Sequence, residues 1–111
     1  MSVFKAYDIR GLAGSQLDSE FARRLGAALV THLEAKTVAV ARDIRESGPE
    51  LHAAFIEGLS GAGANVIDLG ITTTGVLYRA TVDLSIDAAV VITASHNPPE
   101  YNGFKICRGP L

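Results

Sequence analysis

The chain contains very little cysteine and no tryptophan. Its 111 residues include one cysteine, Cys107. A single cysteine cannot form a disulfide within the chain, and its apolar surroundings indicate a small core residue rather than a reactive thiol. No apolar run approaches the roughly 20 residues of a membrane-spanning helix. The first residues also lack the charged-then-apolar order of a signal peptide. These absences predict a cytoplasmic protein with no role at a membrane.

The chain also lacks an excess of positive charge. Ten basic and twelve acidic residues give a formal net charge of -2. This balance argues against a nucleic-acid-binding surface, which usually needs a basic excess. With 48% hydrophobic and 20% charged residues, the composition is typical of a globular domain that buries a core of its own.

The sequence predicts alternating strands and helices. Phe21, Leu25, Leu29 and Leu33 recur at every fourth residue, which predicts a helix that begins after Asp18 and ends near residue 34. Short apolar, β-branched runs predict the strands. The expected elements are a strand at 3–6, a loop at 7–17, a helix at 18–34, a strand at 37–41, a helix at 48–60, a strand at 66–69, a helix at about 73–83, and strands at 88–92 and 104–107.

This alternation predicts an α/β fold with three layers, α/β/α, around a mostly parallel mixed sheet. The pair Asn102-Gly103 is a hairpin signal, so the last strand is expected to run antiparallel to its neighbour. Ser47 and Glu50 have the spacing of a capping box at the start of the second helix. The two helical histidines, His32 and His52, are expected to be solvated. No repeat or linker divides the chain, so residues 1–111 are expected to form one domain.

Ser95 is the first candidate for a functional residue. It follows the buried strand at 88–92, and open α/β sheets bind their ligands at the carboxyl ends of such strands. Pro98 and Pro99 exclude a helix directly after it. A serine hydrolase is disfavoured, because adjacent side chains in extended backbone point apart, which separates Ser95 from His96, and because no G-x-S-x-G motif is present. Taken alone, Ser95 would be a solvated loop serine.

Two segments carry a resemblance to a known family. FKAYDIRG at 4–11 and TASHNPPEYNGFKI at 93–106 resemble the α-D-phosphohexomutases, in particular the bacterial phosphomannomutase/phosphoglucomutase type. The resemblance implies that Ser95 carries a transferable phosphate. It also implies an activity that interconverts hexose 1-phosphate and hexose 6-phosphate through a hexose 1,6-bisphosphate. AYDIRG differs from the segment typical of the glucosamine branch, which favours mannose and glucose phosphates as substrates. A third segment, RDIRESG at 42–48, also resembles a family segment and is interpreted as bracing a loop and capping a helix.

The resemblance implies roles for residues around the phosphoserine. Arg10 would offer a planar fork of donors to phosphate, and Lys105 would act as general acid/base for the sugar hydroxyl. His96 and Asn97 would shape the catalytic loop and contact phosphate or sugar, while Tyr7 would hydrogen-bond a sugar hydroxyl or hold Arg10 in place. Without the resemblance, Arg10 would be a surface arginine, Lys105 a solvated strand lysine and Tyr7 a residue at the core edge.

The resemblance also implies Mg²⁺, held between the phosphate on Ser95 and a D-x-D-x-D loop of a second domain. No such motif occurs in these 111 residues. The chain is therefore expected to be domain I of a longer enzyme, cut short at its C-terminal end and without domains II to IV. By itself it is expected to be inactive and to bind Mg²⁺ weakly at most. The alternative is a non-catalytic module that binds a phosphorylated ligand or a protein partner. Apolar strands left uncovered beyond Leu111 would favour a homodimer.

Overall fold

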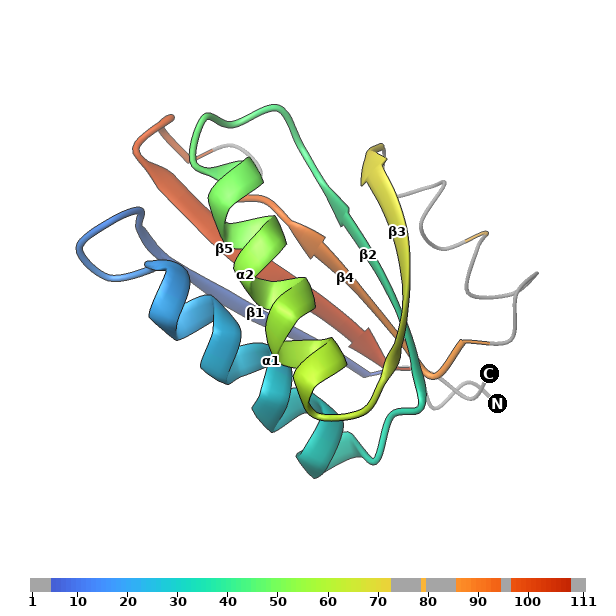
Figure 1. Cartoon of the computed structure of the whole chain (residues 1–111). Helices are drawn as coiled ribbons and strands as arrows, with labels where there is room; N and C mark the ends of the chain where they lie inside the picture. Colours follow the sequence, from blue (N-terminus) through green and yellow to red (C-terminus); the bar gives the residue numbers. More distant parts are fainter. Residues whose placement is uncertain (1–4, 73–78, 80–85, 95–96, 109–111) are drawn as a thin grey trace.

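The chain forms a five-stranded sheet with strand order β1-β5-β4-β2-β3, and two helices pack on one of its faces (Figure 1). The structure, a computed structural model, describes residues 5–72, 79, 86–94 and 97–108. The elements are β1 (Lys5–Leu12), α1 (Ser19–Leu33), β2 (Thr37–Arg42), α2 (Gly48–Gly61), β3 (Asn65–Ile71), β4 (Ala88–Ile92) and β5 (Tyr101–Arg108).

The sheet is mixed, and its last strand opposes the others. β5 pairs antiparallel with both β1 and β4, whereas β2 pairs parallel with β4 and β3. Four strands therefore share one direction, which confirms the predicted α/β fold with an antiparallel last strand. β5 lies inside the sheet, so it provides no free sheet edge for the expected homodimer. The third helix, expected at about 73–83, lies outside the described residues apart from Arg79.

The first helix begins where the sequence predicts. The Asp18 carboxylate accepts a hydrogen bond from the backbone N–H of Phe21 at 2.8 Å, which satisfies one of the donors left unpaired at a helix start. Leu29 is buried, and Phe21, Leu25 and Leu33 pack partly buried against the same core. The apolar stripe seen in the sequence is thus the face of α1 that turns toward the sheet.

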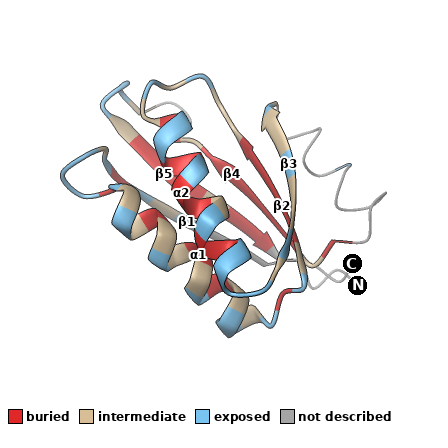
Figure 2. Ribbon diagram, in the orientation of Figure 1, coloured by how far each residue is buried: buried red, intermediate tan, exposed pale blue. Residues whose placement is uncertain are grey.

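The core lies on both faces of the central strands. All five residues of β4 are buried, as Figure 2 shows in red. On the helix face, the rings of Phe55 and Phe104 pack with their centres 5.2 Å apart. On the opposite face a smaller buried cluster comprises Ala39, Ala41, Ile86, Ala89 and Val91. A strand buried on both faces reads as a continuous apolar run, which is why 88–92 was recognisable as a strand.

The first strand differs from its prediction. β1 includes Tyr7 to Gly11, which were expected to form a loop after a strand at 3–6. These residues pair with β5 over the register from Lys5 opposite Arg108 to Leu12 opposite Tyr101. The alternation of polar and apolar residues in YDIR is a strand pattern, and long-range pairing with β5 extends it. Arg10 therefore projects from a strand rather than from a loop.

The pair Asn102-Gly103 does not form a hairpin turn. Both residues lie within β5, and the chain instead turns before it, where the N–H of Tyr101 donates to the carbonyl of Pro98 at 2.9 Å. Asn102 is fully buried and donates to the Ser47 hydroxyl at 2.8 Å. Tertiary contacts rather than turn geometry therefore explain this asparagine and this glycine.

The predicted capping box is also wrong. Ser47 is the N-cap residue of α2, but its side chain makes no capping hydrogen bond, because its hydroxyl accepts from Asn102 instead. Glu50 reaches across to α1 and accepts from the Ser19 hydroxyl at 2.6 Å. Both predicted capping side chains therefore tie α2 to other elements.

The two helical histidines differ in environment. His32 is exposed, as predicted. His52 is buried rather than solvated, and its Nε2 lies 2.8 Å from the Asp68 carboxylate of β3. This contact links the start of α2 to the sheet.

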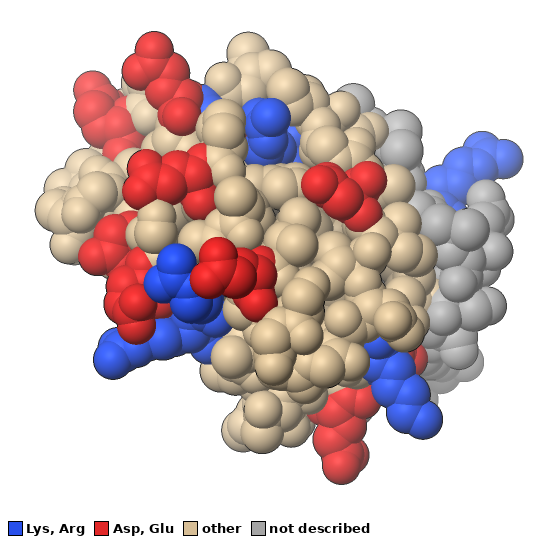
Figure 3. Space-filling view, in the orientation of Figure 1, with Lys and Arg blue, Asp and Glu red and all other residues tan. Residues whose placement is uncertain are grey.

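The helix-covered face carries charges of both signs. Figure 3 shows acidic and basic side chains next to one another there. Arg23 bonds Glu20 and Glu57 at 3.0 and 2.8 Å. Exposed pairs of this kind contribute little to stability. In the described part of the chain, no helix is long and apolar enough to cross a membrane.

Candidate functional site

The carboxyl ends of β1, β2 and β4 meet at one edge of the sheet. Arg10, near the end of β1, donates from Nη1 to the Asn97 side-chain oxygen at 2.8 Å. Asn97 belongs to the loop that follows β4. The Arg10 contact therefore joins the two segments, 4–11 and 93–106, that carry the sequence resemblance. Open α/β sheets bind ligands at such an edge, so we assign the candidate site here.

Asp8 holds the Arg10 side chain in a fixed orientation. Its carboxylate accepts from Arg10 Nε at 3.0 Å and from Nη2 at 2.8 Å, a bidentate pair. Two residues apart on one strand, Asp8 and Arg10 share a face. It is the face opposite the helices, since Ile9 between them packs into the helix-side core. A guanidinium has five N–H groups. Three of them serve Asp8 and Asn97, so two have no partner among the described residues and could bind an anion.

Gly103 makes room for the Arg10 side chain. It lies opposite Arg10 in the β1–β5 register, and a Cβ atom there would lie 3.1 Å from Arg10 Cγ and 3.0 Å from the Thr93 carbonyl oxygen. It would also clash with the carbonyl oxygen of Ile9. A glycine lets the backbone and the arginine approach this closely, so Arg10 can cross β5 to reach the loop after β4.

Asp8 and Arg10 on this face shift each other's pKa. Hydrogen bonds from Arg10 hold the pKa of Asp8 below its ordinary value; burial opposes this more weakly, and the charges of Arg10 and Lys105 act in the same direction as the hydrogen bonds. The hydrogen bonds and charge of Asp8 in turn raise the pKa of Arg10. Lys105 lies on β5 between Asp8 and Val91 in register. Two predicted site residues, Arg10 and Lys105, thus lie on the same face around Asp8.

A second network holds the loop after β4. The Thr93 hydroxyl donates to the Asp43 carboxylate at 2.5 Å. Arg45 donates to the carbonyl oxygens of Pro98 at 2.8 Å and Tyr101 at 3.2 Å. The segment 42–48 was predicted to brace a loop, and these contacts confirm that role. The loop that it braces is the one that contains Ser95.

The structure describes some predicted site residues and leaves others outside its described part. Ser95 and His96 lie outside the described residues, and so does the side chain of Tyr7. Arg10 and Asn97 are in direct contact. The sequence reasoning did not pick out Asp8 or the bond between Asp43 and Thr93. The D-x-R spacing on a strand was the available signal for Asp8, whereas nothing in the sequence pairs residues 43 and 93.

The described residues do not provide a complete Mg²⁺ site. Within the ranges that the structure describes, no group of three or more histidine, cysteine or acidic side chains could hold a metal ion. Two carboxylates at the candidate site are already engaged, Asp8 by Arg10 and Asp43 by Thr93 and Arg45.

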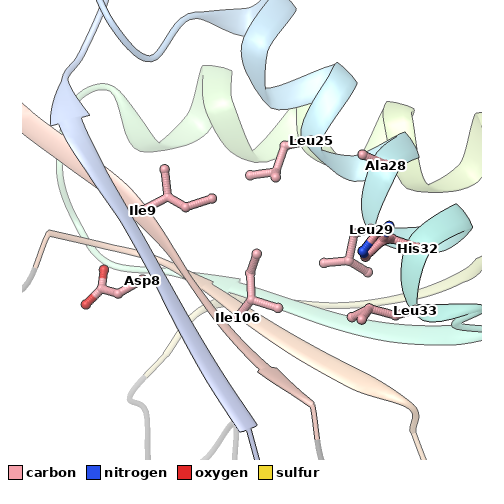
Figure 4. Close-up of a pocket in the computed structure, with 8 residues that line it drawn as sticks. All are labelled: Asp8, Ile9, Leu25, Ala28, Leu29, His32, Leu33 and Ile106. Atoms are coloured by element: carbon pink, nitrogen blue, oxygen red, sulfur yellow. The ribbon is translucent and has the colours of Figure 1, made fainter.

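An apolar groove of about 450 Å³ lies on the other face, between α1 and β1 (Figure 4). Ile9 and Ile106 of the sheet face Leu25 and Leu29 of α1 across it, while Asp8 points to the other side of β1. The groove lies beside an edge strand, since among the described strands β1 pairs with β5 alone. Its apolar lining thus faces α1, and Asp8, which also borders the groove, is the residue that it shares with the polar site.

The fold and the site define an α/β protein that presents arginine and lysine at the carboxyl edge of a mixed sheet. Residues 1–109 match the family model described as phosphoglucomutase/phosphomannomutase, alpha/beta/alpha domain I. The chain belongs to this phosphoglucomutase/phosphomannomutase family.

Individual relatives agree with this assignment. The chain is 46% identical over 113 residues to a phosphomannomutase of Vibrio cholerae, covering 97% of this chain and 24% of that protein. It is 48% identical over 108 residues to a phosphomannomutase/phosphoglucomutase of Pseudomonas aeruginosa, covering 95% and 23%. The crystal structure of a Thermus thermophilus protein assigned as a phosphomannomutase superposes with a TM-score of 0.85 at 30% identity, covering 91% of this chain and 24% of that one. The chain thus spans about a quarter of the length of these relatives.

Proposed function

We propose that this chain is the phosphoserine-bearing domain I of a phosphohexomutase that interconverts hexose 1-phosphate and hexose 6-phosphate, with mannose and glucose as the sugars. The bond between Arg10 and Asn97 carries the proposal, because it brings the two motif segments into one site. Relatives that cover almost the whole chain and are named phosphomannomutase support it. The remaining domains would supply the rest of the active site.

The proposed reaction begins with a phosphate on Ser95. A hydroxyl oxygen of the sugar phosphate attacks phosphorus, the bond from phosphorus to Ser95 Oγ breaks, and a hexose 1,6-bisphosphate forms. The other phosphate of this intermediate then returns to Ser95, so the phosphate count is unchanged over one cycle. Catalysis of this kind consists mainly of positioning and charge neutralisation.

Each residue has a role in this proposal. The two N–H groups of Arg10 that neither Asp8 nor Asn97 uses would neutralise a phosphate oxygen. Lys105 would exchange the proton with the attacking hydroxyl. His96 would shape the loop and contribute to catalysis there, and Tyr7 would bind the sugar. Asp8 keeps the Arg10 fork turned toward the loop after β4.

Mg²⁺ and a cytoplasmic location remain parts of the proposal. Mg²⁺ favours carboxylates combined with phosphate. Besides the phosphate on Ser95, its ligands would have to come from outside the described residues of this chain. We therefore expect the isolated chain to show no mutase turnover, and Mg²⁺ to act only in the complete enzyme.

The proposal is tested by assaying the conversion of glucose 1-phosphate to glucose 6-phosphate. The assay uses the protein made from the full reading frame that includes these residues, with Mg²⁺ and a bisphosphate primer. Turnover is expected, Ser95→Ala should abolish it, and Ser60→Ala, an exposed serine on α2, should leave it unchanged. Binding of sugar phosphate without turnover would instead support the non-catalytic module.

A further inference from the structure

The loop between β2 and α2 forms hydrogen bonds with the loop after β4 on both sides of residues 95 and 96. On the strand side, the Thr93 hydroxyl donates to the Asp43 carboxylate at 2.5 Å. On the far side, Arg45 Nη1 donates to the carbonyl oxygens of Pro98 at 2.8 Å and Tyr101 at 3.2 Å. We call Asp43, Arg45 and Thr93 the brace. The brace fixes both ends of the segment that contains Ser95.

The brace is internally connected and partly buried. Arg45 donates to Asp43 twice, from its backbone N–H at 3.1 Å and from Nε at 3.2 Å. The Arg45 side chain is 11% exposed and the Asp43 side chain 30%. The N–H of Asp43 also donates to the carbonyl of Ile92, the last residue of β4, at 3.2 Å. A partly buried, charge-assisted network of this kind is stronger and more rigid than an exposed ion pair.

The shape of the arginine side chain explains why this residue type is needed. A guanidinium is a planar fork with fixed donor directions. In Arg45, one edge of the fork faces the Asp43 carboxylate and Nη1 faces two backbone carbonyls. A lysine has one ammonium on a flexible stem and cannot hold both groups in one plane. Arg45→Lys is therefore expected to keep the positive charge but not to hold the Asp43 carboxylate and the two backbone carbonyls at once.

We propose that Asp43 and Arg45 are positioning residues, which hold the Ser95 loop so that its phosphate lies in line with the attacking sugar hydroxyl. This inference rests on the proposed function. Neither residue is assigned a contact with substrate, and each acts through the backbone of the loop. Phosphoryl transfer depends mainly on such positioning, so loosening the loop should slow transfer without weakening the sugar binding assigned to Tyr7.

The first test measures kcat and KM for the protein made from the full reading frame. Arg45→Ala is expected to lower kcat about 100-fold, the cost of misplacing a reacting group by about 1 Å, and to leave KM unchanged. Added guanidinium should restore part of the lost rate, and Arg45→Lys should not match the wild type. Arg24→Ala, an exposed residue that pairs with Glu20 one helical turn away, is the control and should change neither constant.

The second test measures hydrogen exchange in the 111-residue chain. The amides of Asn97 and Tyr101, which donate to Ala94 and Pro98, should exchange faster in Arg45→Ala, while the α1 amides keep their wild-type rates. If Arg45→Ala does not fold, Thr93→Val provides the same test, because it removes the hydroxyl at nearly constant shape. The amides of Asn97 and Tyr101 should also exchange faster in this variant.

The outcomes separate this inference from the proposed function. An inactive wild type would overturn the proposed function and the positioning role together, while faster exchange would still establish that the brace orders the loop. An active wild type with equally active Arg45→Ala, or a variant changed in KM alone, would overturn the positioning role and leave the proposed function standing.

Discussion

Replacing Gly103 by alanine tests whether the close approach of β1 and β5 holds the site together. The new methyl group would clash with the Ile9 carbonyl oxygen and would lie 3.0 Å from that of Thr93 and 3.1 Å from Arg10 Cγ. Two of these atoms belong to backbone, which cannot move aside cheaply. Overpacking of this kind costs about 1–3 kcal/mol, and each cross-strand hydrogen bond lost adds about 1 kcal/mol. We expect Gly103→Ala to lower the free energy of unfolding by about 3 kcal/mol, a large part of the total of about 5–15 kcal/mol for a domain.

Thermal and urea unfolding followed by circular dichroism measure this change. At about 4–8 °C per kcal/mol for a small domain, the midpoint should fall by about 15 °C. Gly61→Ala is the matched control, since Gly61 ends α2 and a Cβ there meets nothing within 4 Å. Its stability should stay equal or rise by up to about 1 kcal/mol. A Gly103→Ala chain as stable as the wild type would refute the close approach of β1 to β5.

Three further predictions concern the charge pair, the open sheet edge and the isolated chain. Because the pKa of Asp8 is lowered in the folded chain, its stabilising effect is present above its unfolded pKa of about 3.9 and is lost as the pH falls through the folded value. When urea unfolding is repeated at falling pH below about 5, the free energy of unfolding should therefore decrease less for Asp8→Asn than for the wild type. Equal decreases would contradict a stabilising pair between Asp8 and Arg10. We expect the 111-residue chain to dimerise through the β1 edge and the adjoining groove. Sedimentation would detect this dimer, and Leu12→Lys should weaken it, whereas a strictly monomeric wild type would count against it. The isolated chain should convert no glucose 1-phosphate with Mg²⁺ and a bisphosphate primer, and turnover that Ser95→Ala abolishes would prove this wrong.

The elements that the sequence predicted well are those in which a local pattern and the core agree. The stripe through Leu29 and the cap at Asp18 define α1 by themselves. The run at 88–92 is apolar throughout because both faces of β4 are buried. In these segments the hydrophobic period alone carries the information.

The failures occurred where long-range contacts override local signals. Asn102-Gly103 has the composition of a turn, yet Asn102 is buried against Ser47 and Gly103 admits the backbone of β1. Ser47 has the spacing of a capping residue, yet Asn102 uses its hydroxyl. His52 was expected in solvent, yet it is buried and contacts Asp68. Each of these partners lies far away in the sequence, so no local pattern could reveal them.

The candidate site was predictable as a set of residue types and unpredictable as a geometry. The resemblance singled out Arg10, Asn97 and Lys105, and the structure places Arg10 against Asn97. The resemblance did not indicate that Asp8 orients Arg10 or that Arg45 holds the Ser95 loop. These supporting roles depend on which strands lie side by side, and only the folded sheet defines that order.

The most direct test of the central claim is the mass of the tryptic peptide that contains Ser95, taken from protein made in cells from the full reading frame. The account predicts a mass increase of one phosphate on that peptide, with fragment ions that localise it to Ser95. After incubation with hexose monophosphate that carries labelled phosphate, the label should appear on Ser95, because each cycle returns to the serine the phosphate that arrived on the sugar. Both the mass increase and the label should be absent in Ser95→Ala. Phosphate on another residue, or a phosphate on Ser95 that does not exchange with the phosphate of the sugar, would contradict the account.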